Sequence, residues 1–224
     1  MMNKTILVVA AHADDEVLGC GGTIARHVLE GDVVHLVLMA DGVNSRLESS
    51  EIDLVRRLDS SKVVQNLLGI SSAHYLEFPD NRMDSIPLLD IVQKLEPIIN
   101  KIRPSVIYTH HHGDLNIDHR LTHTAVMTAC RPVPELSVCE IYGFEVLSST
   151  EWVAPQQSSF LPNFFTNITK QLPIKLKALE VYSEEMCAVP HSRSVIHAEI
   201  LAHHRGYNIG VDAAEAFEVY RMIR

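Results

Sequence analysis

The chain has 224 residues, of which 46% are hydrophobic and 21% charged, a balance typical of a soluble globular protein with one sizeable core. Its net charge of −9, without any basic block, argues against nucleic acid or an anionic membrane surface as the main partner. No apolar stretch approaches the roughly 20 residues of a membrane span, so we expect no integral membrane segment.

Apolar runs and helical patterns alternate over the first 130 residues. The runs that predict strands are Thr5 to Ala10, Val33 to Met39, Ala73 to Phe78 and Ser105 to Thr109. The segments with helical periodicity are Val17 to Glu30, Ile52 to Leu68, Leu88 to Ile102 and His119 to Cys130. Strands that alternate with amphipathic helices indicate βαβ units. We therefore predict an α/β, Rossmann-like, doubly wound and mostly parallel sheet flanked by helices.

The rest of the chain, from Arg131, begins with a less periodic region, so we expect irregular C-terminal additions to the sheet. Glu140 to Val146 and Phe164 to Ile168 are candidate strands at its far edge, and Ile174 to Met186 and Val195 to Arg205 have helical patterns. Ala214 to Ile223 fits either a strand or a helix. Without internal repeats or a low-complexity linker, residues 1–224 are predicted to form a single domain.

The four cysteines are scattered, without paired short spacings: Cys20, Cys130, Cys139 and Cys187. This pattern fits reduced thiols better than a disulfide framework or a cysteine zinc site. The apolar N-terminal run also continues into acidic residues without a cleavage site typical of a signal peptide. We therefore expect a cytoplasmic protein.

The first candidate site lies where the first predicted strand ends. His12 follows the apolar run, and three consecutive acids, at positions 14–16, come next. Polar groups at the carboxyl end of a parallel strand lie at the crevice where such sheets bind ligands. Carboxylates beside a histidine are costly to bury unless a cation or a reaction needs them. His12 and Asp15 suit zinc, which leaves Asp14 free to move protons. The competing interpretation is a solvated loop in which Asp14 or Asp15 caps the next helix.

The second candidate site follows the fourth predicted strand. Residues 110–123 contain five histidines, two aspartates and one asparagine. For any single histidine, a loop or capping role is the simpler interpretation. The cluster as a whole has no packing reason, and it should lie at the same sheet edge as His12. A three-ligand zinc site with an open position would activate a water molecule.

Together, these two clusters resemble a known family. Residues 11–16 (Ala-His-Ala-Asp-Asp-Glu) and 113–120 (Gly-Asp-Leu-Asn-Ile-Asp-His-Arg) are similar to the paired motifs of the LmbE-like (PIG-L) zinc-dependent deacetylases. Those enzymes remove the acetyl group from N-acetylglucosaminyl conjugates. The resemblance extends to residues 19–24, Asp41-Gly42, Arg205-Gly206 and Ala214 to Glu218, and so spans nearly the whole chain.

The resemblance implies a set of catalytic residues. His12, Asp15 and His119 would bind Zn²⁺, and Asp14 would be the general base. Ala13 replaces the family's usual proline, which should change loop stiffness rather than chemistry. Asn116 stands where many relatives have a histidine that stabilises the oxyanion. Its amide can still donate a hydrogen bond, and His111 or His112 is an alternative donor.

The implied reaction is hydrolysis of an acetamide on an amino-sugar conjugate, which gives acetate and a free amine. Zinc would lower the pKa of a water molecule toward roughly 7, and Asp14 would take its proton. Arg46, Arg56 and Arg57 follow the second strand and could hold an anionic group of the substrate, with surface solvation expected for at least one. His191 and Arg193 resemble a family stretch at the rim of the active site. Because related proteins often assemble, a homo-oligomer is also among the expected partners.

Two other functions compete with this hypothesis. Gly19-Cys20-Gly21-Gly22 opens a helix after a strand, with Asp41 about 20 residues on, as in a dinucleotide-binding protein. Against this, acidic residues separate the strand from the glycines and would repel a pyrophosphate, and the third glycine of the fingerprint is absent. The glycines would instead let the helix pack close to the sheet. The second alternative is a non-catalytic metal-binding protein of the same fold, which would have no need for Asp14.

Overall fold

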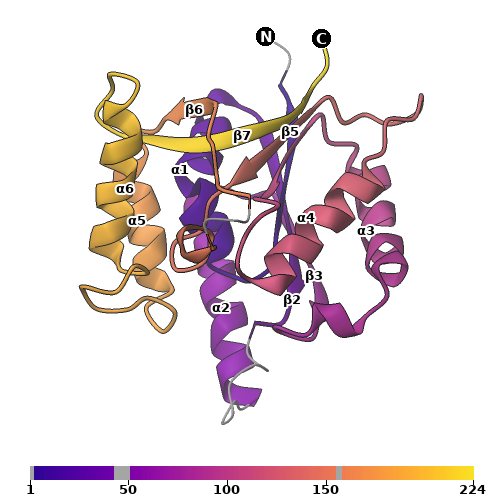
Figure 1. The fold of residues 1–224 in the computed structure, drawn as a ribbon, viewed down its shortest axis with the longest axis horizontal. Coiled ribbons are helices and arrows are strands. Elements are labelled where there is room, and N and C mark those ends of the chain that lie inside the picture. The colour runs from indigo at the N-terminus through magenta and orange to yellow at the C-terminus, as the bar shows by residue number, and fades with distance from the viewer. Residues whose placement is uncertain (1–2, 43–50, 155–157) are drawn as a thin grey trace.

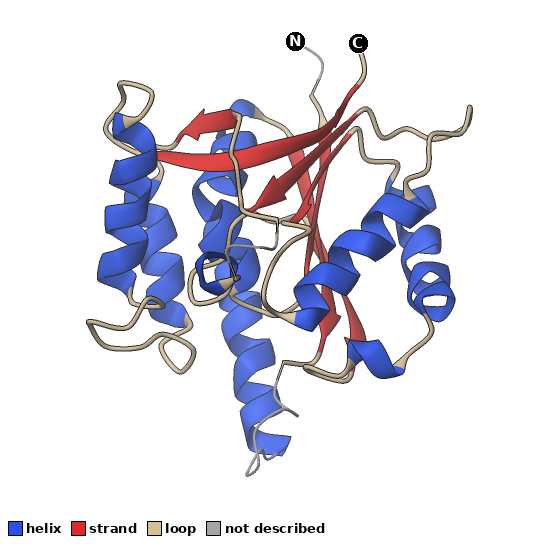
Figure 2. Ribbon diagram, viewed as in Figure 1, coloured by secondary structure: helices blue, strands red, loops and turns tan. Residues whose placement is uncertain are grey.

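The computed structural model describes residues 3–42, 51–154 and 158–224. Its centre is a seven-stranded sheet with the strand order β3-β2-β1-β4-β5-β7-β6, shown in red in Figure 2 with helices on both faces. The strands are β1 (Thr5–Ala10), β2 (Val33–Ala40), β3 (Ser72–Phe78), β4 (Val106–His110), β5 (Glu140–Phe144), β6 (Phe164–Asn167) and β7 (Ala214–Met222). The first five are parallel to one another. The predicted α/β, mostly parallel sheet is confirmed.

Helices from the described part of the chain cover both faces of the sheet (Figure 1). They are α1 (Asp15–Glu30), α2 (Glu51–Leu68), α3 (Leu88–Ile102), α4 (Ile117–Ala129), α5 (Leu172–Val181) and α6 (Val195–Tyr207), with short 3-10 turns at Met83–Ser85 and Thr150–Trp152. Alternate residues of a strand point to opposite faces. In β1, Ile6 and Val8 therefore pack with α1, α2, α5 and α6, whereas Leu7 and Val9 pack with α3 and α4. No helix in the described ranges is long and apolar enough to cross a membrane.

The order of the strands determines where the site lies. β1 pairs with β2 on one side and with β4 on the other, so the connections run in opposite directions from this point. In open α/β sheets, the carboxyl ends of the strands at such a switch point border the ligand-binding crevice. His12 follows β1, and the loop that begins at His111 follows β4. The two polar clusters are therefore adjacent.

The C-terminal half differs from the sequence-based prediction in two respects. The segment Glu140 to Val146 was predicted to be a strand at the far edge of the sheet. It forms β5, which lies inside the sheet between β4 and β7. The ambiguous segment from Ala214 is the strand β7, and it runs antiparallel to both β5 and β6. Strand order depends on contacts between distant residues, which the local pattern did not contain.

Helix α1 is interrupted near its first third. Cys20 has a non-helical backbone (φ −148°, ψ 23°), so nearby peptide groups lose their partners within the helix. The Glu215 carboxylate accepts the backbone N–H groups of residues 22 and 23, at 2.9 and 2.7 Å. The Lys175 ammonium donates to the Leu18 carbonyl oxygen, at 2.9 Å, and to Glu215, at 2.6 Å. This buried ion pair therefore stabilises the break in the helix.

Candidate metal centre and active site

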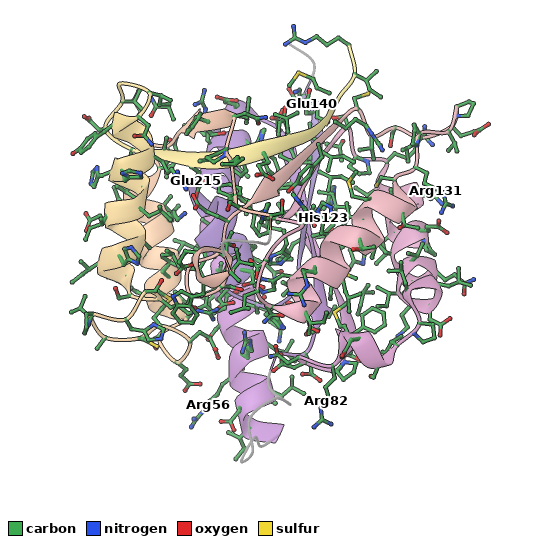
Figure 3. The ribbon with its side chains drawn as sticks, in the orientation of Figure 1. Arg56, Arg82, His123, Arg131, Glu140 and Glu215 are labelled. Atoms are coloured by element: carbon green, nitrogen blue, oxygen red, sulfur yellow. The ribbon has the colours of Figure 1, made fainter. Side chains whose placement is uncertain are left out.

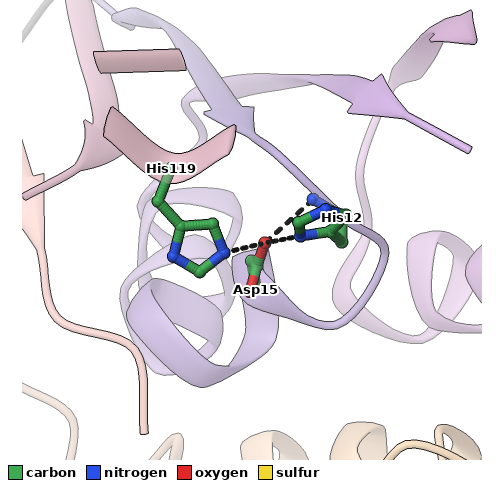
Figure 4. A group of neighbouring side chains, drawn as sticks. All are labelled: His12, Asp15 and His119. Atoms are coloured by element: carbon green, nitrogen blue, oxygen red, sulfur yellow. Dashed lines mark hydrogen bonds and ion pairs between the residues drawn. The ribbon is translucent and has the colours of Figure 1, made fainter. Parts of the chain in front are cut away.

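Three side chains from the two polar clusters meet beyond the ends of β1 and β4. His12 follows β1, Asp15 begins α1, and His119 lies in the first turn of α4. The Oδ2 atom of Asp15 lies 3.2 Å from His12 Nδ1 and 3.2 Å from His119 Nε2, as Figure 4 shows. All three residues are buried. Together they form a group of nitrogen and oxygen donors that could hold a metal ion.

The chemistry of this group fits a zinc ion. Ligand atoms bonded to tetrahedral zinc at about 2.0–2.2 Å lie roughly 3.3 Å from one another, close to the 3.2 Å observed. Asp15 Oδ1 and His119 Nε2 are also buried without a hydrogen-bond partner among the described residues. Burial of such atoms is costly unless another group satisfies them. A cation between the three side chains would do so.

Interactions between the charged side chains of the group shift their pKa values in the direction opposite to the shift caused by burial. Burial alone would raise the pKa of Asp15, but His119, His12 and His110 hold it well below its ordinary value. Burial would lower the pKa of His119, whereas Asp15 and Asp114 raise it to about 9 in the metal-free protein. In the metal-free protein Asp15 is therefore an anion paired with the protonated His119 ring, and a metal ion would take the place of the proton on that ring.

Asp14 precedes Asp15 but is not one of the three residues of the group. Its carboxylate accepts a hydrogen bond from Arg193 Nη1 at 2.9 Å, and Arg57 Nη2 is 3.8 Å away. Burial raises the pKa of Asp14 to about 6, although the two arginines oppose this shift. Its backbone φ of 130° is a strained conformation that is concentrated at functional sites and costs about 1–3 kcal/mol.

The solvated-loop interpretation of the acidic run is wrong. Asp14, Asp15 and Glu16 are at most 1% exposed, and Asp14 occupies the N-cap position of α1 without a side-chain capping hydrogen bond. Glu16 accepts hydrogen bonds from the Tyr182 hydroxyl at 2.7 Å and from the Asp14 backbone N–H at 2.9 Å. The acids are therefore inside the protein, each with a specific environment.

Two further aspartates contact His12 and were given no role by the sequence analysis. His12 Nε2 lies 3.1 Å from Asp80 Oδ1 and 3.2 Å from Asp118 Oδ2. Asp118 also accepts the backbone N–H groups of Asn81 and Met83, at 2.7 and 3.1 Å. Asp118 directly precedes His119, and Asp80 follows β3 at the same sheet edge. Their positions at strand and helix ends were the signal that could have identified them.

A small open cleft of about 150 Å³ leads to the site. Its lining residues are all polar apart from one glycine: His12, Gly42, Arg57, Asp80, Asn81, Asn116, Glu185 and Arg193. Arg57 donates to the Gly42 carbonyl oxygen and, at 3.0 Å, to that of Ala13, and it pairs with Glu185 at 2.9 Å. A cleft of this kind suits a ligand rich in hydroxyl groups rather than an apolar one.

Asn116 and His111, two of the expected oxyanion donors, lie in different places. Asn116 lines the cleft and caps α4, where its Oδ1 accepts the backbone N–H of Asp118 at 2.8 Å. Its Nδ2 donates to Asn81 Oδ1 at 3.1 Å. His111 is not among the cleft residues. Its Nδ1 lies 2.9 Å from Glu218 Oε2, and its Nε2 lies 3.0 Å from the Ser158 carbonyl oxygen.

The residues expected to bind substrate are also separated. Arg56 is exposed, extends away from the sheet (Figure 3), and lies 3.5 Å from Glu184. Its neighbour Arg57 is the cleft residue. Arg193 reaches Asp14, and His191 is exposed and accepts the Arg193 backbone N–H at 3.0 Å. Arg46 lies outside the described residues.

The glycines that suggested dinucleotide binding have a packing role. A Cβ atom at Gly19 would come within 2.3 Å of the Phe144 ring, and one at Gly22 within 2.7 Å of Ile168. The N–H of Gly22 already donates to Glu215, so it is not free to bind a pyrophosphate. These contacts account for the glycines without a nucleotide.

Comparison with known proteins identifies the family. The family model described as GlcNAc-PI de-N-acetylase (PIG-L) matches residues 7–130. The chain belongs to the PIG-L family. A relative from Escherichia coli K12, named uncharacterized deacetylase YaiS, is 32% identical over 183 residues, covering 79% of this chain and 89% of the relative. The predicted resemblance is confirmed.

Solved structures share the fold of this PIG-L protein. The N,N'-diacetylchitobiose deacetylase from Pyrococcus horikoshii has a TM-score of 0.78 at 21% identity, covering 97% of this chain and 84% of the other. GalB, a 4-carboxy-2-hydroxymuconate hydratase from Pseudomonas putida, has a TM-score of 0.77 at 21% identity, with 99% and 98% covered. Since a hydratase has the same fold, the reaction must be argued from the site.

Proposed function

We propose that this PIG-L protein is a zinc-dependent N-deacetylase. Its substrate would be an N-acetylglucosaminyl or related amino-sugar conjugate, and its products acetate and a free amine. One observation carries the proposal: the buried donors of His12, Asp15 and His119 converge, while the Asp14 carboxylate beside them is outside the ligand set. The family's description and the activity named for the Pyrococcus protein support the amide and the sugar.

His12, Asp15 and His119 would hold the zinc ion. When bound, zinc would supply a Lewis acid that polarises the acetamide carbonyl and makes a water molecule more acidic. Asp14 takes a proton from this water as its oxygen attacks the carbonyl carbon. The carbon–nitrogen bond then breaks, and Asp14 returns the proton to the departing amine nitrogen. Asp14 thus ends the cycle as it began, and no other reactant is consumed.

We assign stabilisation of the developing negative charge on the carbonyl oxygen to Asn116. The Nδ2 group has two N–H donors, of which one reaches Asn81, and the side chain lines the cleft. A preorganised donor at this position stabilises the transition state more than the ground state. Because His111 is outside the cleft, we do not extend this role to it.

The polar cleft is the proposed sugar-binding region. Arg193 and His191 are proposed at its rim, whereas the exposed position of Arg56 makes that residue a weaker candidate. Hydroxyl groups of a sugar would hydrogen-bond to the carboxylate and amide side chains of the lining. We further propose that residues 1–224 act as a single deacetylase domain on a small-molecule substrate.

Substitution of Asp14 tests the proposal. We expect Asp14→Asn to lower the rate of acetate release from N-acetylglucosaminyl conjugates by about 10²–10⁴-fold, because the amide cannot take the proton. Zinc content, measured by elemental analysis, should remain at the wild-type level. Asp84→Asn, at an exposed position, is the matched control and should retain the wild-type rate.

Two results would contradict this function. An Asp14→Asn variant with the wild-type rate would exclude Asp14 as the base. A zinc-loaded wild-type protein that released no acetate from any of the N-acetylated sugars would favour the non-catalytic metal-binding alternative.

A further inference from the structure

The two ring nitrogens of His119 face two different carboxylates. Nε2 lies 3.2 Å from Asp15, within the proposed metal group, and Nδ1 lies 3.1 Å from Asp114 Oδ1. Asp114 is in the loop between β4 and α4 and is fully buried. It is not one of the proposed metal ligands. The two nitrogens can therefore have separate functions, one toward the metal and one toward the protein.

Asp114 is itself held by several donors. Oδ1 accepts the Asn116 backbone N–H at 2.9 Å and the Ser149 hydroxyl, and Oδ2 accepts the Thr150 hydroxyl at 2.6 Å. Ser149 and Thr150 are both only 4% exposed. They lie 35 and 36 residues beyond Asp114, in the segment after β5. Two hydroxyl groups and a peptide N–H thus fix a buried carboxylate against one face of the site.

We propose that Asp114 is a positioning residue that sets the tautomer and orientation of His119. This inference rests on the metal centre of the proposed function. Neutral imidazole carries one proton, and a carboxylate beside Nδ1 keeps that proton there. The lone pair of Nε2 is then directed at the metal position. Ser149 and Thr150 contribute through Asp114, since their hydroxyl groups prevent the carboxylate from rotating away.

The remaining contacts of the His119 ring favour the same orientation. His110 stacks on it with ring centroids 3.9 Å apart. His110 Nε2 accepts the Ala11 backbone N–H at 2.8 Å, so the stacked ring is itself anchored to the end of β1. Stacking restricts the plane of the His119 ring but does not determine which nitrogen is protonated. That choice is left to Asp114.

Zinc affinity tests the inference without any substrate. We would measure zinc binding by competition with a chromophoric chelator for wild type, Asp114→Asn and Thr150→Val. Asp114→Asn keeps the shape of the side chain but removes its charge, and we expect about 10–100-fold weaker zinc binding. Thr150→Val should weaken binding in the same direction by a smaller factor.

A matched control separates this effect from a general loss of stability. Glu145 is another largely buried carboxylate, paired with Arg205 at 2.7 and 2.8 Å. Glu145→Gln should leave zinc affinity unchanged. Cobalt substitution adds a geometric measurement, because the visible absorption of the Co²⁺ protein should change in Asp114→Asn and not in Glu145→Gln.

The tautomer can be observed directly in the wild type. Long-range ¹H–¹⁵N correlation spectra of the zinc-loaded protein should show His119 protonated at Nδ1. Wild-type zinc affinity in Asp114→Asn would overturn the role of Asp114 and leave the deacetylase proposal intact. An Nε2–H tautomer in the zinc-loaded protein would overturn both, because a protonated Nε2 cannot bind the metal. A wild-type protein that binds no zinc would instead remove the metal centre on which both proposals depend.

Discussion

Several carboxylic acids are buried in this protein, and each of them has different neighbouring groups. Asp15 faces imidazoles, and Asp118 accepts two backbone N–H groups. An ionised carboxylate in the interior costs several kcal/mol unless partners compensate it. Burial raises the pKa of Asp14 to about 6 despite Arg193, and it raises the pKa of Glu16 to about 7. A group that titrates near neutral pH is suited to moving a proton.

The pair formed by His111 and Glu218 should make stability depend on pH. Burial would raise the pKa of Glu218, but His111 and neighbouring donors lower it from 4.5 to about 2. Burial would lower the pKa of His111, but Glu218 raises it above 6.5. Glu218 therefore stabilises the fold above pH 4.5 and loses this effect as the pH falls toward 2. His111 stabilises it below pH 6.5 and loses this effect at higher pH.

Glu218→Gln should remove the contribution that the ionised Glu218 makes to stability above pH 4.5. At pH 5.5 we expect the free energy of unfolding to fall by about 2 kcal/mol, as for other hydrogen bonds to charged groups. The difference between wild type and variant should shrink at pH 3. Urea unfolding at both pH values, in the presence of a chelator, measures this, and Glu135→Gln at an exposed position is the control. Equal differences at the two pH values would contradict the prediction.

At the scale of secondary-structure elements, α1 joins the candidate metal centre to the core. It begins with the proposed ligand Asp15, and its glycine-rich first half packs against β5 and the segment after β6. A side chain at Gly19 would push this helix away from Phe144. Since Asp15 is only four residues earlier, the close approach of helix and sheet also determines where the ligand lies.

Gly19→Ala should therefore destabilise the protein. Its Cβ atom would lie 2.3 Å from the buried Phe144 ring, and overpacking of this kind costs about 1–3 kcal/mol. Gly21→Ala is the matched control, because its nearest neighbour is the Val17 side chain at 3.0 Å and alanine favours a helix by about 1 kcal/mol. Urea unfolding measures both. A loss of stability no larger at position 19 than at position 21 would show that the contact with Phe144 is unimportant.

At the scale of the whole molecule, the strand order assembles the site from distant parts of the chain. β1 and β4 are adjacent although about 100 residues separate them in sequence. The segment after β5 supplies the hydroxyl groups that hold Asp114, and the segment before α6 supplies Arg193. Metal binding should therefore stabilise the entire fold, because the bound ion connects separate elements of the sheet.

Removal of zinc should lower the melting temperature of the wild-type protein. At a free zinc concentration of 100 Kd, binding stabilises the folded state by about 2.7 kcal/mol. For a chain of this length, that corresponds to roughly 5–10 °C. Thermal unfolding with chelator and after addition of zinc measures the shift. Asp15→Asn should lose most of this response. A wild-type melting temperature that zinc and chelator leave unchanged would contradict the presence of a metal site.

By itself, the sequence determined the elements with strong local periodicity and the types of residue at the site. The strand Thr5–Ala10 and the helix Leu88–Ile102 were predicted with their observed bounds, because burial of an apolar run or stripe is encoded by neighbouring residues. His12 and Asp15 could be proposed as metal ligands from their position at a strand end, whereas the resemblance to the PIG-L family selected His119 from the five histidines of the second cluster.

Only the tertiary structure decided how these parts meet. The position of β5 inside the sheet, the separation of Arg56 from Arg57, and the contacts of Asp80 and Asp114 all depend on residues far apart in the chain. The sequence also could not show that the acidic run is buried, because the arginines that contact Asp14 come from α2 and from the segment before α6. Local patterns determine elements, whereas partners of buried polar groups are determined by packing between elements.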